Sequence, residues 1–175
     1  MRPKVSVIVP VYNVERYLRE CLESLASQTI DSLEIVCVND GSTDGSLRVL
    51  EDFASDHPNV VIVDKENAGY GAAMNDGVDV ATGEYFGIVE PDDYVLDNMF
   101  ERLYQIAKDN NLDLIKSDHY EFRGKDIGDQ SSYVPLTRDQ SYYGHVINPS
   151  KDPTVFNLNM VTCSGIYNLD YVKNS

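Results

Sequence analysis

The feature that most constrains the fold of this chain is a regular alternation of apolar and amphipathic segments between residues 4 and 117. Apolar runs rich in β-branched and aromatic residues predict five buried strands, at 5–9, 34–38, 60–63, 85–89 and 113–116. Between them apolar residues recur at helical spacing, as in Leu18, Cys21, Leu22 and Leu25. Strands that alternate with helices predict an α/β fold, a mostly parallel sheet flanked by helices on both faces.

Sheets of this kind bind their ligands beyond the carboxyl ends of the strands, near the point where the strand order reverses. Three polar loops follow predicted strands here, at 10–15, 39–44 and 90–93. Because parallel strands all end at the same edge of the sheet, we expect these loops to converge on one site.

The most acidic of these loops is Glu90-Pro91-Asp92-Asp93, which ends a buried strand. Clustered carboxylates repel one another, and a divalent cation with oxygen ligands would relieve that repulsion. An acidic turn before a helix is also common, because carboxylates favour helix N-termini. The loop alone therefore does not distinguish metal binding from a structural turn, but a metal here would indicate a site that handles phosphates.

The other two loops also allow a structural and a functional interpretation. Loop 10–15 is either a simple turn capped by Asn13 or a wall on which Tyr12 packs against a flat heterocycle. Loop 39–44 has ordinary turn and cap residues. Asp40 nevertheless directly follows a buried strand, where its carboxylate can accept a hydrogen bond from the imide N–H of uracil.

The segment 67–77 contains a G-x-G element, but it follows the third strand rather than the first, so it does not match the dinucleotide-binding pattern. It opens a helix expected from about Ala72 to Ala81. Small residues would let the positive end of that helix approach a phosphate. Tight packing of the helix on the sheet would explain them equally well.

Composition excludes several classes of partner. With 175 residues and a formal net charge of −15, the chain fits one acidic domain that repels nucleic-acid backbones and anionic membrane surfaces. Its cysteines, Cys21, Cys37 and Cys163, show no zinc or C-x-x-C spacing and predict buried free thiols in a reducing cytosol. No apolar run is long enough to span a bilayer, although an anchor elsewhere in a longer parent protein stays open.

Beyond residue 118 the periodicity fades, and residues 118–160 are rich in Tyr, Asp, Asn, Ser and Pro. They predict an irregular excursion or a hairpin layer over the site. We therefore divide the single domain into an α/β core at 1–117 and a second part at 118–175. We expect the second part to be truncated, because the structured segment 166–172 runs to the end of the chain.

Four segments in order resemble glycosyltransferase family 2, the inverting enzymes with a GT-A fold. They are V-S-V-I-V-P-V-Y-N at 5–13, V-N-D-G-S-T-D at 38–44, N-A-G-Y-G-A-A-M-N-D-G at 67–77 and A-T-G-E-Y-F-G-I-V-E-P-D-D at 81–93. The resemblance implies inverting transfer from a nucleotide-diphosphate sugar, by default UDP-linked with GDP or dTDP as alternatives, to a glycan or lipid-linked acceptor. It further implies bacterial cell-surface polysaccharide synthesis in the cytoplasm or at the inner membrane face, and leaves the oligomeric state open.

The same resemblance implies roles for individual residues. Asp40 would bind the base, Gly69 and its helix would face the diphosphate, and Asp92 and Asp93 would hold Mn²⁺ or Mg²⁺. The full donor-binding set comprises Pro10, Tyr12, Glu15, Asp40, Gly69, Asn75, Glu90 and Asp92.

Three departures from the family pattern matter. Glu90 stands where many members have Asp, and Met74 stands where many have a cation. The family's general base lies in a later acidic motif, and Cys163 begins a segment that resembles the one preceding it. We therefore expect the base beyond Ser175, and expect this chain to bind donor nucleotide weakly without efficient transfer.

Two other functions remain to be weighed. A sugar-nucleotide pyrophosphorylase would need a Gly-rich basic loop after the first strand, where this chain has Pro10-Val11-Tyr12-Asn13. A catalytically impaired domain that serves nucleotide-sugar binding or assembly would explain Glu90, Met74 and the missing base. The intact pair Asp92 and Asp93 argues against it.

Overall fold

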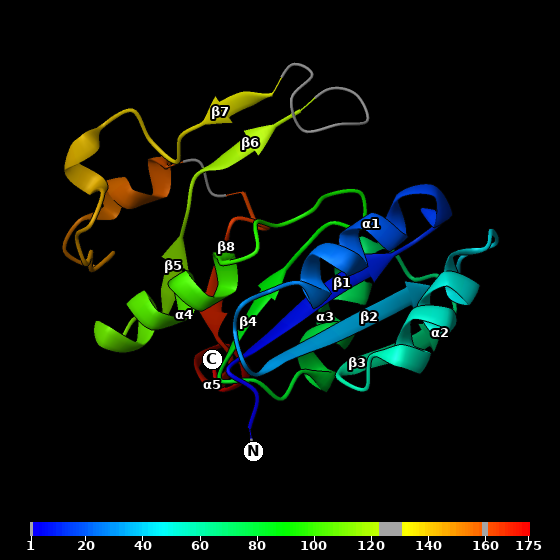
Figure 1. The fold of residues 1–175 in the computed structure, drawn as a ribbon. Helices are drawn as coiled ribbons and strands as arrows, with labels where there is room; N and C mark the ends of the chain where they lie inside the picture. Colours follow the sequence, from blue (N-terminus) through cyan, green and yellow to red (C-terminus); the bar gives the residue numbers. More distant parts are fainter. Residues whose placement is uncertain (1, 123–130, 159–160) are drawn as a thin grey trace.

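A six-stranded sheet forms the centre of the molecule (Figure 1). The computed structural model describes residues 2–122, 131–158 and 161–175. The strand order is β3-β2-β1-β4-β8-β5. The strands are β1 (Val5–Val11), β2 (Leu33–Asp40), β3 (Val60–Lys65), β4 (Tyr85–Ile88), β5 (Leu114–Lys116) and β8 (Gly165–Asn168). Strands β1 to β4 pair in parallel, and β8 runs antiparallel to both of its neighbours.

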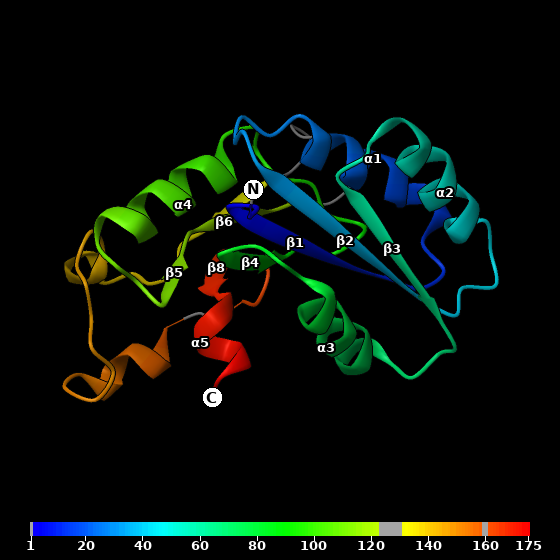
Figure 2. The same ribbon diagram turned by 90° about the horizontal axis from the view of Figure 1, so that it is seen from below.

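Helices cover both faces of the sheet, as the sequence predicts (Figure 2). One face carries α1 (Glu15–Ala26), α2 (Ser46–Asp56) and α4 (Met99–Asp109), and the other carries α3 (Tyr70–Val80) and α5 (Leu169–Lys173). Strand β1 serves both cores, because alternate side chains of a strand point to opposite faces. Val7 and Val9 pack in the core under α1, while Ile8 packs in the core under α3.

The strand β8 is absent from the sequence prediction. It has four residues and no periodicity of its own, and it is positioned by long-range pairing of Ile166 with Gly87 on one side and Ile115 on the other. Gly165 makes that pairing possible, since a Cβ there would overlap the carbonyl oxygen of Ile115. The antiparallel strand separates β4 from β5, which the sequence places at the end of a continuous parallel series.

Two predicted helix starts also differ from the structure. Helix α3 begins at Tyr70, two residues before the expected Ala72. Helix α1 has Val14 at its N-cap with no side-chain cap, so the cap predicted at Asn13 is wrong. Asn13 instead adopts a φ of 53° and binds a neighbouring loop.

The part after residue 118 contains an antiparallel pair, β6 (His119–Glu121) with β7 (Ser132–Val134), and two 3₁₀ turns, η1 (Gln140–Tyr142) and η2 (Pro153–Asn157). Both alternatives are met in part, because the two short strands pair while the described residues from 135 to 158 are irregular apart from the two 3₁₀ turns. The ring of Phe122 lies 5.2 Å from that of Tyr94, so the pair is attached beside the acidic turn. Among the described helices, none is long and apolar enough to cross a membrane.

We predict that Gly77→Ala destabilises the fold, because α3 packs so closely on β1 that a Cβ at Gly77 would overlap Ile8 Cγ2. Overpacking of this kind costs about 1–3 kcal/mol. The matched control is Gly71→Ala on the same helix, where no atom lies within 4 Å of the added Cβ. Urea denaturation should show a lower midpoint for the first variant only, and equal midpoints would contradict the packing.

Candidate functional site

The loops after β1, β2 and β4 leave the same edge of the sheet. Strand β1 pairs with β2 up to Val11↔Asn39 and with β4 up to Ile8↔Ile88. In the sheet, β2 and β3 lie on one side of β1 and β4 lies on the other, so the strand order reverses beside β1. This edge is where an open α/β sheet places its ligand site. The convergence expected from the sequence is therefore present.

Side chains join the first two loops into one wall. The amide oxygen of Asn13 accepts hydrogen bonds from the backbone N–H of Thr43 at 2.7 Å and of Asp44 at 3.3 Å. The Glu15 carboxylate accepts the N–H of Gly45 at 2.9 Å. Tyr12, in the same loop, is 50% exposed. Glu15 thus braces the loops, and the Tyr12 ring is available to a ligand, while Pro10 is buried within β1.

Asp40 occupies the end of β2 and is almost fully buried, with a side-chain exposure of 4%. Its Oδ1 accepts from Lys65 Nζ and from the Ala68 N–H, both at 2.9 Å, and its Oδ2 accepts from the Gly69 N–H at 2.8 Å. Burial acts to raise the pKa of Asp40, but the hydrogen bonds from Ala68, Lys65 and Gly69 outweigh it and lower the pKa. The carboxylate is therefore ionised at neutral pH and fixes the loop that enters α3.

The N-terminus of α3 faces open space. Gly69 has a φ of 91°, a conformation that glycine tolerates without strain, and neither Gly69 nor Gly71 has an atom within 4 Å of an added Cβ. Asn75 is exposed one turn further along. Met74, by contrast, packs against the core under α3, so the position that many family members give to a cation is apolar and partly buried here.

The acidic loop is a turn closed by a hydrogen bond from the Asp93 N–H to the Glu90 carbonyl at 3.0 Å. Asp92 and Asp93 are exposed. Although the Asp93 side chain reaches solvent, desolvation by neighbouring protein atoms and then the negative charges of Asp92 and Glu90 raise its pKa. That repulsion is what a cation would relieve. The described residues contain no ready-made cluster of three or more His, Cys, Asp or Glu side chains around a metal position. Two carboxylates nevertheless fit Mg²⁺, which commonly takes its remaining ligands from water and substrate phosphates.

The Glu90 side chain is partly buried and hydrogen-bonded to other side chains. Its Oε1 accepts a hydrogen bond from the Tyr70 hydroxyl and another from Cys163 Sγ at 3.2 Å. Burial and the nearby carboxylate raise the pKa of Tyr70 and raise that of Cys163 to about 12, so both groups keep the proton that they donate. Cys21 and Cys37 are buried and free as predicted, whereas Cys163 is free but only partly buried, so its predicted burial is wrong.

Sequence reasoning missed three residues of this site: Lys65, Tyr70 and Cys163. Lys65 had a usable signal, because it ends β3 as Asp40 ends β2, and the two are register partners in the parallel pair. Tyr70 and Cys163 had none, since their contact with Glu90 joins positions 20 and 73 residues apart.

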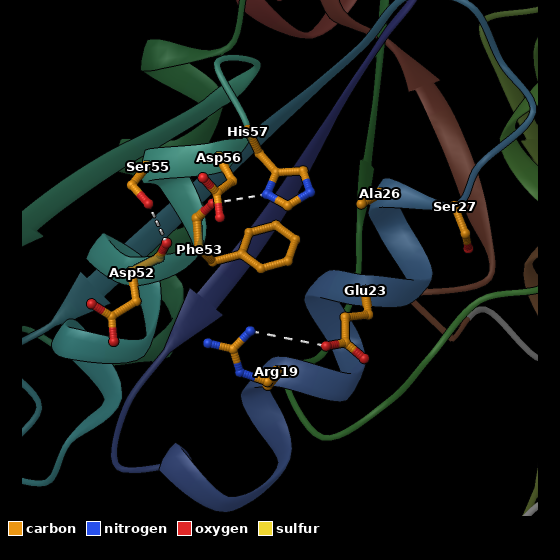
Figure 3. A pocket seen from close by; sticks show the side chains of 9 residues that line it. All are labelled: Arg19, Glu23, Ala26, Ser27, Asp52, Phe53, Ser55, Asp56 and His57. Atoms are coloured by element: carbon orange, nitrogen blue, oxygen red, sulfur yellow. Dashed lines mark hydrogen bonds and ion pairs between the residues drawn. The ribbon is translucent and has the colours of Figure 1, made fainter.

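A hollow of about 640 Å³ lies elsewhere, between α1 and α2 (Figure 3). The rings of Phe53 and His57 stack there with their centroids 3.9 Å apart. On the α1 side, Arg19 forms an ion pair with Glu23. None of the predicted donor or metal residues lines it. The residues predicted to bind donor and metal therefore lie at the sheet edge and not in this hollow.

Comparison with known proteins identifies the family. The sequence profile of "Glycosyl transferase family 2" matches residues 6–166. The chain is 42% identical over 135 residues to the uncharacterized glycosyltransferase EpsJ of Bacillus subtilis (strain 168), covering 77% of this chain and 38% of that protein. It is 40% identical over 115 residues to the poly(ribitol-phosphate) beta-glucosyltransferase of Bacillus spizizenii, covering 63% and 18%.

Solved structures agree with this assignment. The crystal structure of S. aureus TarS 1-349 in complex with UDP-GlcNAc superposes with a TM-score of 0.77 at 25% identity, over 98% of this chain and 47% of that one. The chain thus spans less than half the length of these proteins. From the sheet order, the loop edge and these matches together, we conclude that the chain has a GT-A fold and belongs to glycosyl transferase family 2.

Proposed function

We propose that the chain is the donor-binding part of a glycosyltransferase. The enzyme would move a sugar from a UDP-sugar to a glycan or lipid-linked acceptor in cell-surface polysaccharide synthesis. The observation that carries the proposal is that the first two loops, the open end of α3 and the acidic turn lie at one edge of the sheet. The UDP-GlcNAc bound to TarS supports the donor class, and the name of the Bacillus spizizenii relative, poly(ribitol-phosphate) beta-glucosyltransferase, supports the process.

In this proposal the nucleoside end of the donor lies against the wall formed by the loops that follow β1 and β2, at 11–14 and 40–45. The exposed Tyr12 ring offers a flat surface for the base, Glu15 braces the loop that carries it, and Pro10 is buried at the end of β1. A carboxylate has about four acceptor positions, and protein donors occupy three on Asp40. One position on Oδ2 thus has no donor among the described residues, and the imide N–H of uracil would have to reach it through the 4% of the side chain that is exposed.

The diphosphate end belongs between α3 and the acidic turn. The positive end of α3, entered through Gly69 and carrying Asn75, would face the phosphates. Asp92 and Asp93 would hold Mn²⁺ or Mg²⁺, an ion that, when bound, neutralises charge on the departing nucleoside diphosphate. Without the ion, the same two carboxylates would repel the phosphates, so binding of the diphosphate should depend on the metal.

Transfer also needs a base that takes the proton of the acceptor hydroxyl, which attacks the anomeric carbon from the face opposite the leaving group. We assign no described residue to that role. The packing of Met74 into the core favours, as a second candidate, a domain that binds nucleotide-sugar without catalysing transfer. Both candidates require the same donor site, and a cytoplasmic location supplies the donor to either.

We predict that UDP-sugars with Mn²⁺ raise the thermal midpoint of the chain more than GDP- or dTDP-sugars do. A ligand at ten times its Kd stabilises by about 1.4 kcal/mol, which is about 3–6 °C for a chain of this size. Asp92→Asn should lose the Mn²⁺-dependent part of the shift. Glu51→Gln, which makes the same charge change at an exposed position of α2, should keep it. If no nucleotide shifts the wild type, the donor site is contradicted, and a full shift in Asp92→Asn would exclude that metal ligand.

We also predict that Asp40→Asn lowers stability at neutral pH by about 1.5–3 kcal/mol, because it weakens buried hydrogen bonds to a charged acceptor. The folded-state pKa of Asp40 lies below its unfolded value, so its contribution is present above about pH 4 and is lost as the pH falls through the folded pKa. Urea unfolding at pH 7 and at the lowest pH that keeps the fold should show the difference between wild type and variant shrinking. A difference that stays constant with pH would contradict the assigned ionisation.

A further inference from the structure

One oxygen of Glu90 joins two distant parts of the chain. Its Oε1 accepts from the hydroxyl of Tyr70, the first residue of α3, and from Sγ of Cys163, which precedes β8. The acidic turn, the start of α3 and the segment before β8 therefore meet at this one carboxylate. Its Oε2 has no hydrogen-bond partner among the described residues.

The backbone of Glu90 is held as firmly as its side chain. Its carbonyl accepts the Asp93 N–H at 3.0 Å and lies 3.5 Å from Cys21 Sγ on α1. The preceding N–H, of Val89, donates to the Ile8 carbonyl at 3.0 Å and continues the ladder with β1. Asp92 and Asp93 follow within the same turn. Because Glu90, Asp92 and Asp93 share one turn, a shift of the Glu90 backbone would move the two exposed carboxylates.

From this geometry we propose that Tyr70 is a positioning residue, which acts through Glu90 to set Asp92 and Asp93 against the N-terminus of α3. The inference rests on the proposed donor site and deepens it. Tyr70 is 46% exposed, so its ring contributes little to either core. Its hydroxyl contact with Glu90 crosses from the phosphate-facing helix to the acidic turn.

The length of the side chain at position 90 is part of the arrangement. An aspartate is shorter by one methylene, about 1.5 Å, so from the same backbone position its oxygens would fall short of Tyr70 and Cys163. The glutamate is therefore matched to Tyr70. Replacing it by aspartate should therefore impair the site.

The test is a double-mutant cycle of Tyr70→Phe and Glu90→Asp, read as UDP affinity with and without Mn²⁺ by calorimetry. Each single variant should weaken Mn²⁺-dependent UDP binding about 5- to 10-fold, because the carboxylates lose their alignment. The double variant should be no worse than Glu90→Asp alone, because that variant already removes the contact with Tyr70. In Tyr70→Phe, UDP affinity without metal should change by less than about 2-fold. Tyr17→Phe, at an exposed tyrosine of α1 whose hydroxyl has no partner among the described residues, should match the wild type.

Each outcome decides between the claims. If the wild type binds UDP but the two effects multiply, or if Tyr70→Phe weakens binding equally with and without Mn²⁺, the positioning role is overturned and the donor site stands. If the wild type binds no nucleotide, the donor site and the positioning role both fail. The contact itself is checked separately by the thermal midpoints of the four proteins without ligand. These should be non-additive, and additive midpoints would overturn the pairing.

Discussion

The buried carboxylate of Asp40 is the contact on which the arrangement of the site depends. It ends β2, and its partners are the ammonium of Lys65 at the end of β3 and two backbone N–H groups at the entry to α3. A buried charge is costly unless it is paired and hydrogen-bonded, and here the charge is both. One side chain thereby fixes two strand ends and one helix start. The direction in which α3 presents its N-terminus follows from that anchor.

The sheet explains why polar groups of this chain gather where they do. Strands β1 and β2 are buried on both faces, so their side chains are apolar almost throughout. Polar side chains can reach solvent or hydrogen-bonding partners mainly where the strands end. At that edge the loops satisfy one another, as Asn13 and Glu15 do with residues 43–45. Asp92 and Asp93 of the acidic turn lack such compensation. Both side chains are exposed, and neither forms an ion pair with a described residue, which makes the turn the electrostatically incomplete part of the site.

The sequence predicts much of this architecture because its signals are local. Runs such as 5–9 and 34–38, and helical spacing such as that from Leu18 to Leu25, identify elements that the structure confirms. Parallel topology then brings the three loops together without any knowledge of side-chain contacts. What escaped prediction is non-local. Strand β8 exists through its pairing with β4 and β5, and the contacts of Lys65, Tyr70 and Cys163 depend on register and tertiary distance.

The antiparallel strand also has a consequence for how the chain is made. The outer strand β5 has β8 as its sole neighbour in the sheet, and Ile166 of β8 fills the core between α4 and the sheet. During synthesis from the N-terminus, the ribosome would release β1 to β5 well before β8 emerges. In that interval the backbone of β4 on the side away from β1 has no partner, and β5 has no place in the sheet. The nascent chain would carry an open strand edge, a surface that invites pairing with other chains, until about residue 168 is available to close it.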